Sequence, residues 1–144
     1  MDKIERNRRN MRRFMDCINT NDKALAEELI EPKAEFASLI SKEKLYGGAG
    51  YLSVVDFMRK SFSDIRWDIV DMAAEYDKIA VSWTCSGTHD GEFMGASGTG
   101  KKFSFSAMNF YYFNDEGKII KDVAAKGLIG LLEALGMAGA PQLK

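Results

Sequence analysis

Few side chains in this sequence suit acid–base chemistry, and most of them lie in its second half. His89 is the only histidine in 144 residues, so a catalytic triad would have no other imidazole as its base. Tyr111 could donate a hydrogen bond to a carbonyl or enolate oxygen, but its neutral phenol is a poor base at pH 7. We therefore take His89 and Tyr111 as candidate catalytic groups, with the carboxylates of Asp71 and Asp122 as alternatives.

Metal-binding side chains are equally scarce. The two cysteines, Cys17 and Cys85, stand alone in a predicted helix and a predicted strand. Such isolated thiols indicate buried, small apolar residues rather than a disulfide. With one histidine and no Cys/His set at ligand spacing, we expect no metal site.

A glycine-rich stretch partly matches the sequence pattern of a phosphate-binding loop. Residues 95–101 fit the pattern G-x-x-x-x-G-K, but Lys102 follows where Ser or Thr would hold magnesium. The motif also needs a helix after it, and the residues from 102 onward alternate as a strand does. We therefore expect a connecting loop here and no nucleotide site.

Composition favours a single soluble domain over residues 1–144. Twenty basic residues nearly balance 21 acidic ones, which gives no general attraction to nucleic acid or to an anionic membrane. The N-terminus has no apolar signal segment, and no apolar run approaches the length of a membrane span. We expect a cytoplasmic protein that binds neither nucleic acid nor membrane.

The hydrophobic period changes from helical to strand-like along the chain. Apolar residues at helical spacing predict helices over 3–18, 22–30 and 51–62, with a short strand within 33–40 and a glycine loop at 47–50. Alternation then predicts strands over 66–74, 78–89, 102–113 and 118–126, before a last helix over 128–135 and a frayed tail at 137–144. Helices followed by hairpin-linked strands predict an α+β fold, in which a curved antiparallel sheet packs against N-terminal helices as a cone.

The cone should enclose an apolar pocket, because one face of each strand is apolar. Strict alternation turns the last strand's odd-numbered residues inward, including Lys121 and Val123, and leaves Asp122 in solvent unless a bulge shifts the register. The predicted substrate-binding residues all lie on the inward faces: Trp83, Asn109, Tyr111, Phe113 and Val123.

Three of the polar candidates have plainer interpretations. A buried Asn109 needs a hydrogen-bond partner, which can be a protein group or a ligand. Trp83 can serve core packing alone, and His89 can simply cap the turn at Asp90-Gly91.

Five short motifs between residues 78 and 136 occur together in one known family. They are GTH at 87–89, G-x-F-x-G at 91–95, TGK at 99–101, GKI at 117–119 and LLxxLG at 131–136. In order and spacing they resemble the SnoaL-like polyketide cyclases of the nuclear transport factor 2-like superfamily. The resemblance implies a cone-shaped α+β homodimer. It further implies that the protein closes polyketide rings by intramolecular aldol condensation without metal or cofactor. In this reaction a pocket carboxylate would act as general acid and base.

The family carries that carboxylate in a Trp-x-x-x-Asp pattern after GKI, and the chain has Val123 and Gly127 at those two positions. Three readings therefore stay open. The protein is a cofactor-free cyclase or isomerase with a different acid–base group, a non-catalytic module that binds a small apolar or aromatic molecule, or a dimeric accessory protein. The small, polar outer face of the sheet, with Ser82, Thr84 and Ser106, suits contact between two copies.

Overall fold

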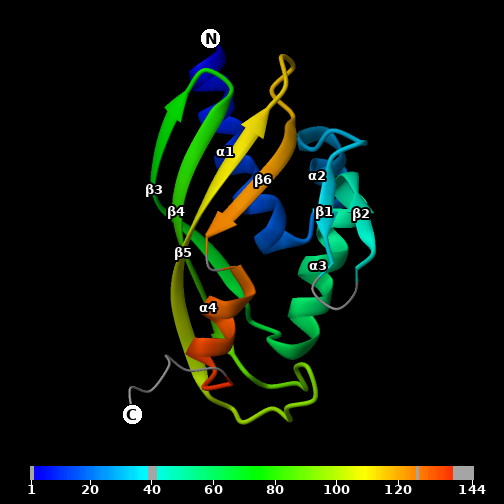
Figure 1. Cartoon of the computed structure of the whole chain (residues 1–144), viewed down its shortest axis with the longest axis vertical. Coiled ribbons are helices and arrows are strands. Elements are labelled where there is room, and N and C mark those ends of the chain that lie inside the picture. The colour runs from blue at the N-terminus through cyan, green and yellow to red at the C-terminus, as the bar shows by residue number, and fades with distance from the viewer. Residues whose placement is uncertain (1, 39–41, 126, 138–144) are drawn as a thin grey trace.

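A computed structural model describes residues 2–38, 42–125 and 127–137 (Figure 1). Four helices and six strands follow one another along the chain: α1 (Lys3–Thr20), α2 (Lys23–Leu29), β1 (Glu35–Ala37), β2 (Lys44–Tyr46), α3 (Gly47–Ser61), β3 (Arg66–Glu75), β4 (Lys78–Thr88), β5 (Lys102–Phe113), β6 (Ile119–Ala125) and α4 (Gly127–Ala134). The predicted α+β fold, with a curved antiparallel sheet against N-terminal helices, is confirmed.

Capping residues define both ends of α1. Asp2 accepts a hydrogen bond from the backbone of Glu5, and Asn21 ends the helix in the left-handed region at φ 54°. Asp22 then caps α2 by accepting from the Leu25 backbone N–H. The two helices therefore meet at a sharp corner.

The segment before β3 contains more regular structure than the sequence suggested. Strand β2 pairs with β1, and α3 begins at Gly47, although residues 47–50 were predicted to form a loop. Gly48 explains part of the difference, because a Cβ there would lie 2.7 Å from the backbone of Ala26. Glycine thus allows α3 to start against α2.

Four long strands form one antiparallel sheet in the order β3-β4-β5-β6. The hairpin between β5 and β6 turns at Asn114–Gly117, where Gly117 has φ 82° and Asn114 accepts from two backbone N–H groups. Helices α1 and α3 cover the concave face, and α4 follows β6 at the far end (Figure 1). The core lies between this face and the helices.

A β-bulge interrupts the pairing of β5 with β6. Phe113 pairs with Ile119, but Tyr112 pairs with Lys121, so Ile120 is an extra residue on β6. Because side chains alternate along a strand, one extra residue reverses the faces of all residues after it. From residue 121 onward, β6 is therefore in the opposite phase to the one that strict alternation predicts.

Within the described ranges, no helix combines the length and apolar character needed to cross a bilayer. Apart from Met137, the predicted frayed tail lies outside the described residues.

Candidate functional site

A pocket of about 270 Å³ lies between the concave face of the sheet and α3. Its walls come from β1, α3, all four strands of the main sheet and α4, which makes it the interior of the predicted cone. The described lining residues are Phe36, Ala37, Tyr51, Val54, Val55, Met58, Trp67, Trp83, Cys85, Phe105, Asn109, Asp122, Ala124 and Leu131.

Asp122 is the one carboxylate among these lining residues. The bulge at Ile120 turns it inward, opposite Tyr111 on β5, while Val123 turns outward and is 44% exposed. Burial raises the pKa of Asp122 from 3.8 to about 6, because the apolar pocket disfavours the charged form. A carboxyl group with such a pKa can both accept and return a proton near neutral pH.

Two tyrosines stand beside Asp122. Burial raises the pKa of Tyr51 and of Tyr111 well above 10, and the negative charge of Asp122 raises both further. The two hydroxyl groups are hydrogen-bonded to each other. Because a tyrosine hydroxyl can both donate and accept, the Tyr51 hydroxyl can donate to a ligand in the pocket that Tyr51 lines.

A hydrogen bond between Trp83 and Asn109 orients the pocket's amide group. The indole Nε1 of Trp83 donates to Oδ1 of Asn109 over 2.8 Å. Since an indole can only donate, the atom facing it must be the amide oxygen. The two Nδ2–H groups of Asn109 are the donors that remain for a ligand.

The rest of the pocket wall is apolar. Cys85 belongs to it, because burial raises the pKa of its thiol to about 12 and keeps it protonated. The site thus combines one titratable carboxyl group with neutral donors in an apolar enclosure. Such an arrangement can remove a proton next to a carbonyl group and stabilise the resulting enolate oxygen.

Only some of the residues predicted to bind substrate line the pocket. Trp83 and Asn109 both line the pocket. Tyr111 is 2% exposed and is not among the described lining residues; its ring packs against Phe14, and it contacts the pocket wall through its hydrogen bond with Tyr51. Phe113 is buried in the core nearer to α1. Val123 was predicted to face inward, and this was wrong because of the bulge.

His89, the other catalytic candidate, lies away from the pocket lining. It is 3% exposed, and its ring centroid is 5.5 Å from that of Phe62. Among the described residues, Nε2 of His89 has no hydrogen-bond partner. The imidazole is therefore a buried part of the second core cluster, which holds Phe62, Phe93 and Phe103.

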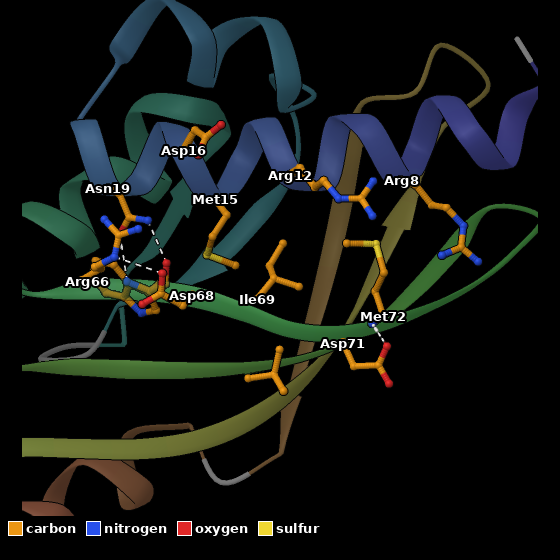
Figure 2. A pocket seen from close by; sticks show the side chains of 12 residues that line it. Arg8, Arg12, Met15, Asp16, Asn19, Arg66, Asp68, Ile69, Asp71 and Met72 are labelled. Carbon is orange, nitrogen blue, oxygen red and sulfur yellow. Dashed lines mark hydrogen bonds and ion pairs between the residues drawn. The ribbon is translucent and has the colours of Figure 1, made fainter.

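A second hollow, of about 520 Å³, lies between α1 and β3 (Figure 2). Asn19 closes one end with a reciprocal pair of hydrogen bonds to the Trp67 backbone, of 2.7 and 2.8 Å, and Arg66 pairs with Asp68 beside it. Arg8 and Arg12 extend from α1 toward the other end (Figure 2). Charges of both signs line this hollow, so it lacks the apolar enclosure that raises the Asp122 pKa, and we do not take it as the active site.

Strict alternation placed Asp122 in solvent, although its carboxylate was an alternative candidate if a bulge shifted the register, and Tyr51 was not predicted to line the pocket. A signal for Asp122 was present, because strict alternation would have turned the long, charged Lys121 inward instead. Burying an unpaired ammonium group is costly, and this cost favours a shifted register. Tyr51 was recognised only as the first residue of a helical apolar stripe.

The family model for SnoaL-like polyketide cyclases matches residues 8–135. This match covers most of the 144 residues, so the chain belongs to the SnoaL-like polyketide cyclase family. None of the curated proteins compared with the chain matches it.

Solved structures show the same fold. TsrD from Streptomyces laurentii is 20% identical and superposes with a TM-score of 0.79 over 96% of this chain and 99% of that one. IdmH from Streptomyces antibioticus, described as a candidate polyketide cyclase, is 24% identical, with a TM-score of 0.74 over 90% and 98%. A SnoaL-like polyketide cyclase from Agrobacterium tumefaciens is 17% identical, with a TM-score of 0.70 over the same shares.

Proposed function

We propose that this protein is a cofactor-free acid–base enzyme that closes a ring by intramolecular aldol addition, with Asp122 as the proton-transferring group. One observation carries the proposal. The carboxyl group of Asp122 lies in an apolar pocket that raises its pKa to about 6, next to neutral hydrogen-bond donors. Asp122 thus supplies the chemistry that the family pattern assigns to the position of Gly127.

The reaction can be written with atoms and charges in balance. The Asp122 carboxylate removes a proton from the carbon next to a substrate carbonyl, and the enolate oxygen accepts hydrogen bonds from Asn109 Nδ2–H and the Tyr51 hydroxyl. The enolate carbon then bonds to a second carbonyl carbon of the same molecule. The new alkoxide takes back the proton held by Asp122, so no oxidant, reductant or external base is consumed.

A non-catalytic binding module is the alternative function. It is favoured by Gly127, where the family pattern has its catalytic carboxylate. Both functions need the pocket, but only the enzyme needs the carboxyl group of Asp122.

Solvent deuterium exchange separates the two. The probe is 2-acetylnaphthalene, whose methyl protons lie next to a carbonyl group, and NMR measures their replacement by deuterium. We expect the wild-type protein to accelerate exchange, with a rate that rises through about pH 6 as Asp122 ionises. Asp122→Asn should reduce the protein-dependent rate about 10²–10⁴-fold. The matched control is Asp71→Asn, since Asp71 is exposed on β3.

Equal exchange rates for the wild type and Asp122→Asn would contradict the enzyme proposal. If neither protein accelerates exchange but both bind the ketone, the binding module is the better description. The control protects against a general effect of removing one negative charge.

We also propose that two copies associate through the outer face of the sheet. Met108, Phe110 and Val123 are 57%, 48% and 44% exposed there, and the register brings Phe110 opposite Val123. Adjacent apolar side chains on a sheet face favour contact with another surface. Light scattering after size-exclusion chromatography should give twice the chain mass for the wild type and the single mass for Phe110→Lys. A monomeric wild type at micromolar concentration would contradict the dimer.

A further inference from the structure

The size of the pocket and the position of Asp122, the one charged side chain among its described lining residues, restrict what the pocket can bind. We infer that the substrate is an uncharged carbonyl compound with an aromatic body of about two fused rings, and that three-ring compounds and carboxylates are excluded. This inference rests on the proposed function, because it names the substrate of the same site.

Volume sets the limit on ring number. The pocket measures about 270 Å³, whereas an engineered apolar cavity of about 150 Å³ holds one benzene molecule. The pocket is therefore less than twice the size of a one-ring cavity, and it lies just below the range of about 300–1,000 Å³ that is usual for ligand sites. A body of two fused rings fits this space, and a third ring would have to leave it.

The walls explain why the volume is small. Aromatic side chains project into the cone from opposite sides: Phe36 and Tyr51 pack edge to face at 5.0 Å, and Trp83 packs against Phe105 at 6.1 Å. Phe105 lies four residues from Asn109 on the same face of β5, about 13 Å along the strand. It therefore closes the apolar end, away from Asp122 and Asn109.

Charge sets the second limit. Asp122 is ionised above about pH 6, and among the described lining residues there is no lysine, arginine or histidine. A ligand carboxylate placed near Asn109 would meet a like charge and leave its own charge unpaired in an apolar site. A ketone or ester carbonyl can accept from Asn109 and Tyr51 without that cost.

The polar groups gather at one end, which orients the ligand. Asp122 pairs with Tyr111, and Asn109 lies two residues along β5 on the same face. Cys85 and Phe105 pair with each other nearer the opposite end. The carbonyl group should therefore lie by Asp122 and Asn109, with the rings between Trp83 and the apolar end.

Isothermal titration calorimetry at pH 8 tests both limits without requiring turnover. The four probes are acetophenone, 2-acetylnaphthalene, 2-acetylanthracene and 2-naphthoate. We expect 2-acetylnaphthalene to bind the wild type most tightly, and 2-acetylanthracene and 2-naphthoate to bind at least about tenfold more weakly. For the carboxylate, repulsion between two charges a few ångströms apart in a poorly solvated site is ample for this factor.

Two variants test the cause of each exclusion. Asp122→Asn removes the like charge, so it should bind 2-naphthoate at least about tenfold more tightly than the wild type does. Phe105→Ala opens the apolar end, so it should bind 2-acetylanthracene at least about tenfold more tightly. If Phe105→Ala does not fold, the wild-type series still decides the size limit.

Equal or tighter wild-type binding of the three-ring ketone would overturn the size limit, and equal binding of 2-naphthoate and 2-acetylnaphthalene would overturn the charge limit. No binding of any probe would overturn the inference as a whole. Failure of the proposed function would give a different result. The wild-type protein would then not accelerate deuterium exchange of 2-acetylnaphthalene, but the four probes would still bind in the expected order of affinity.

Discussion

Asp122 on β6 lies directly opposite Tyr111 on β5, on the concave face of the sheet. This pairing exists only because Ile120 is an extra residue on β6. Strict alternation would have put Lys121 opposite Tyr111 and Asp122 in solvent. The position of one bulged residue therefore decides whether the pocket contains a carboxyl group or an ammonium group.

Asp122→Asn should make the protein more stable above pH 6. The folded-state pKa of Asp122 lies above its ordinary value, so the wild type loses stability as pH rises from about 4 to about 6 and regains none above that. The rise from 3.8 to about 6 corresponds to about 3 kcal/mol at most. Urea denaturation at pH 8 and pH 4 checks this: a gain for Asp122→Asn is expected only at pH 8. A loss of stability at pH 8 would contradict a desolvated carboxylate.

His89→Leu should leave proton exchange unchanged within about threefold. The imidazole is buried against Phe62, and its Nε2 has no partner among the described residues, so an apolar replacement removes an unsatisfied group. We expect the free energy of unfolding to change by less than about 1 kcal/mol or to rise. Loss of exchange in a folded His89→Leu protein would return this histidine to the list of catalytic candidates.

Asn109→Leu should weaken both stability and ketone binding. It removes the two Nδ2–H donors and leaves the indole N–H of Trp83 unpaired, which costs about 1–3 kcal/mol. The double variant Asn109→Leu/Trp83→Phe should recover part of the stability, because both hydrogen-bonding groups are then replaced by apolar ones. Calorimetry with 2-acetylnaphthalene should show weak binding to both variants, and unchanged binding would mean that Asn109 serves only the core.

Deletion of Ile120 tests the bulge directly. Without this residue Lys121 follows Ile119 in regular alternation, so Lys121 still faces outward, Asp122 still lies opposite Tyr111, and exchange of 2-acetylnaphthalene protons should be kept. The control deletes both Ile120 and Lys121, which moves Asp122 to the outer face opposite Tyr112, so exchange should fall to the level of Asp122→Asn. Circular dichroism establishes that both deletion variants are folded. Full activity in the folded double-deletion variant would contradict the role of Asp122 and of its register.

The fold could be predicted from the sequence because its signals are local and strong. Helical spacing from Met11 to Ile18, alternation in β4 and β5, and the turn at Asn114–Gly117 each have one favoured conformation. The short strand β2 and the early start of α3 depend instead on long-range contacts, such as the approach of Gly48 to Ala26. A single sequence does not contain that information in its local pattern.

The site was only half predictable for the same reason. Trp83 and Asn109 lie on β4 and β5, which pair without a shift, so alternation placed them correctly. Val123 and Asp122 follow the bulge, and alternation fails there. The family pattern places its catalytic carboxylate at the position of Gly127, whereas the carboxyl group in this pocket belongs to Asp122, five residues earlier.

An NMR titration of the Asp122 carboxyl carbon shows directly whether this side chain lies in the apolar pocket. Protein labelled with carbon-13 at the aspartate side-chain carboxyl is titrated from pH 3 to pH 8, and the signal missing from Asp122→Asn is assigned to Asp122. We expect a midpoint near pH 6, well above the ordinary aspartate value of 3.8. A midpoint near the ordinary value of 3.8 would mean that Asp122 is solvated, and would contradict its role in the pocket.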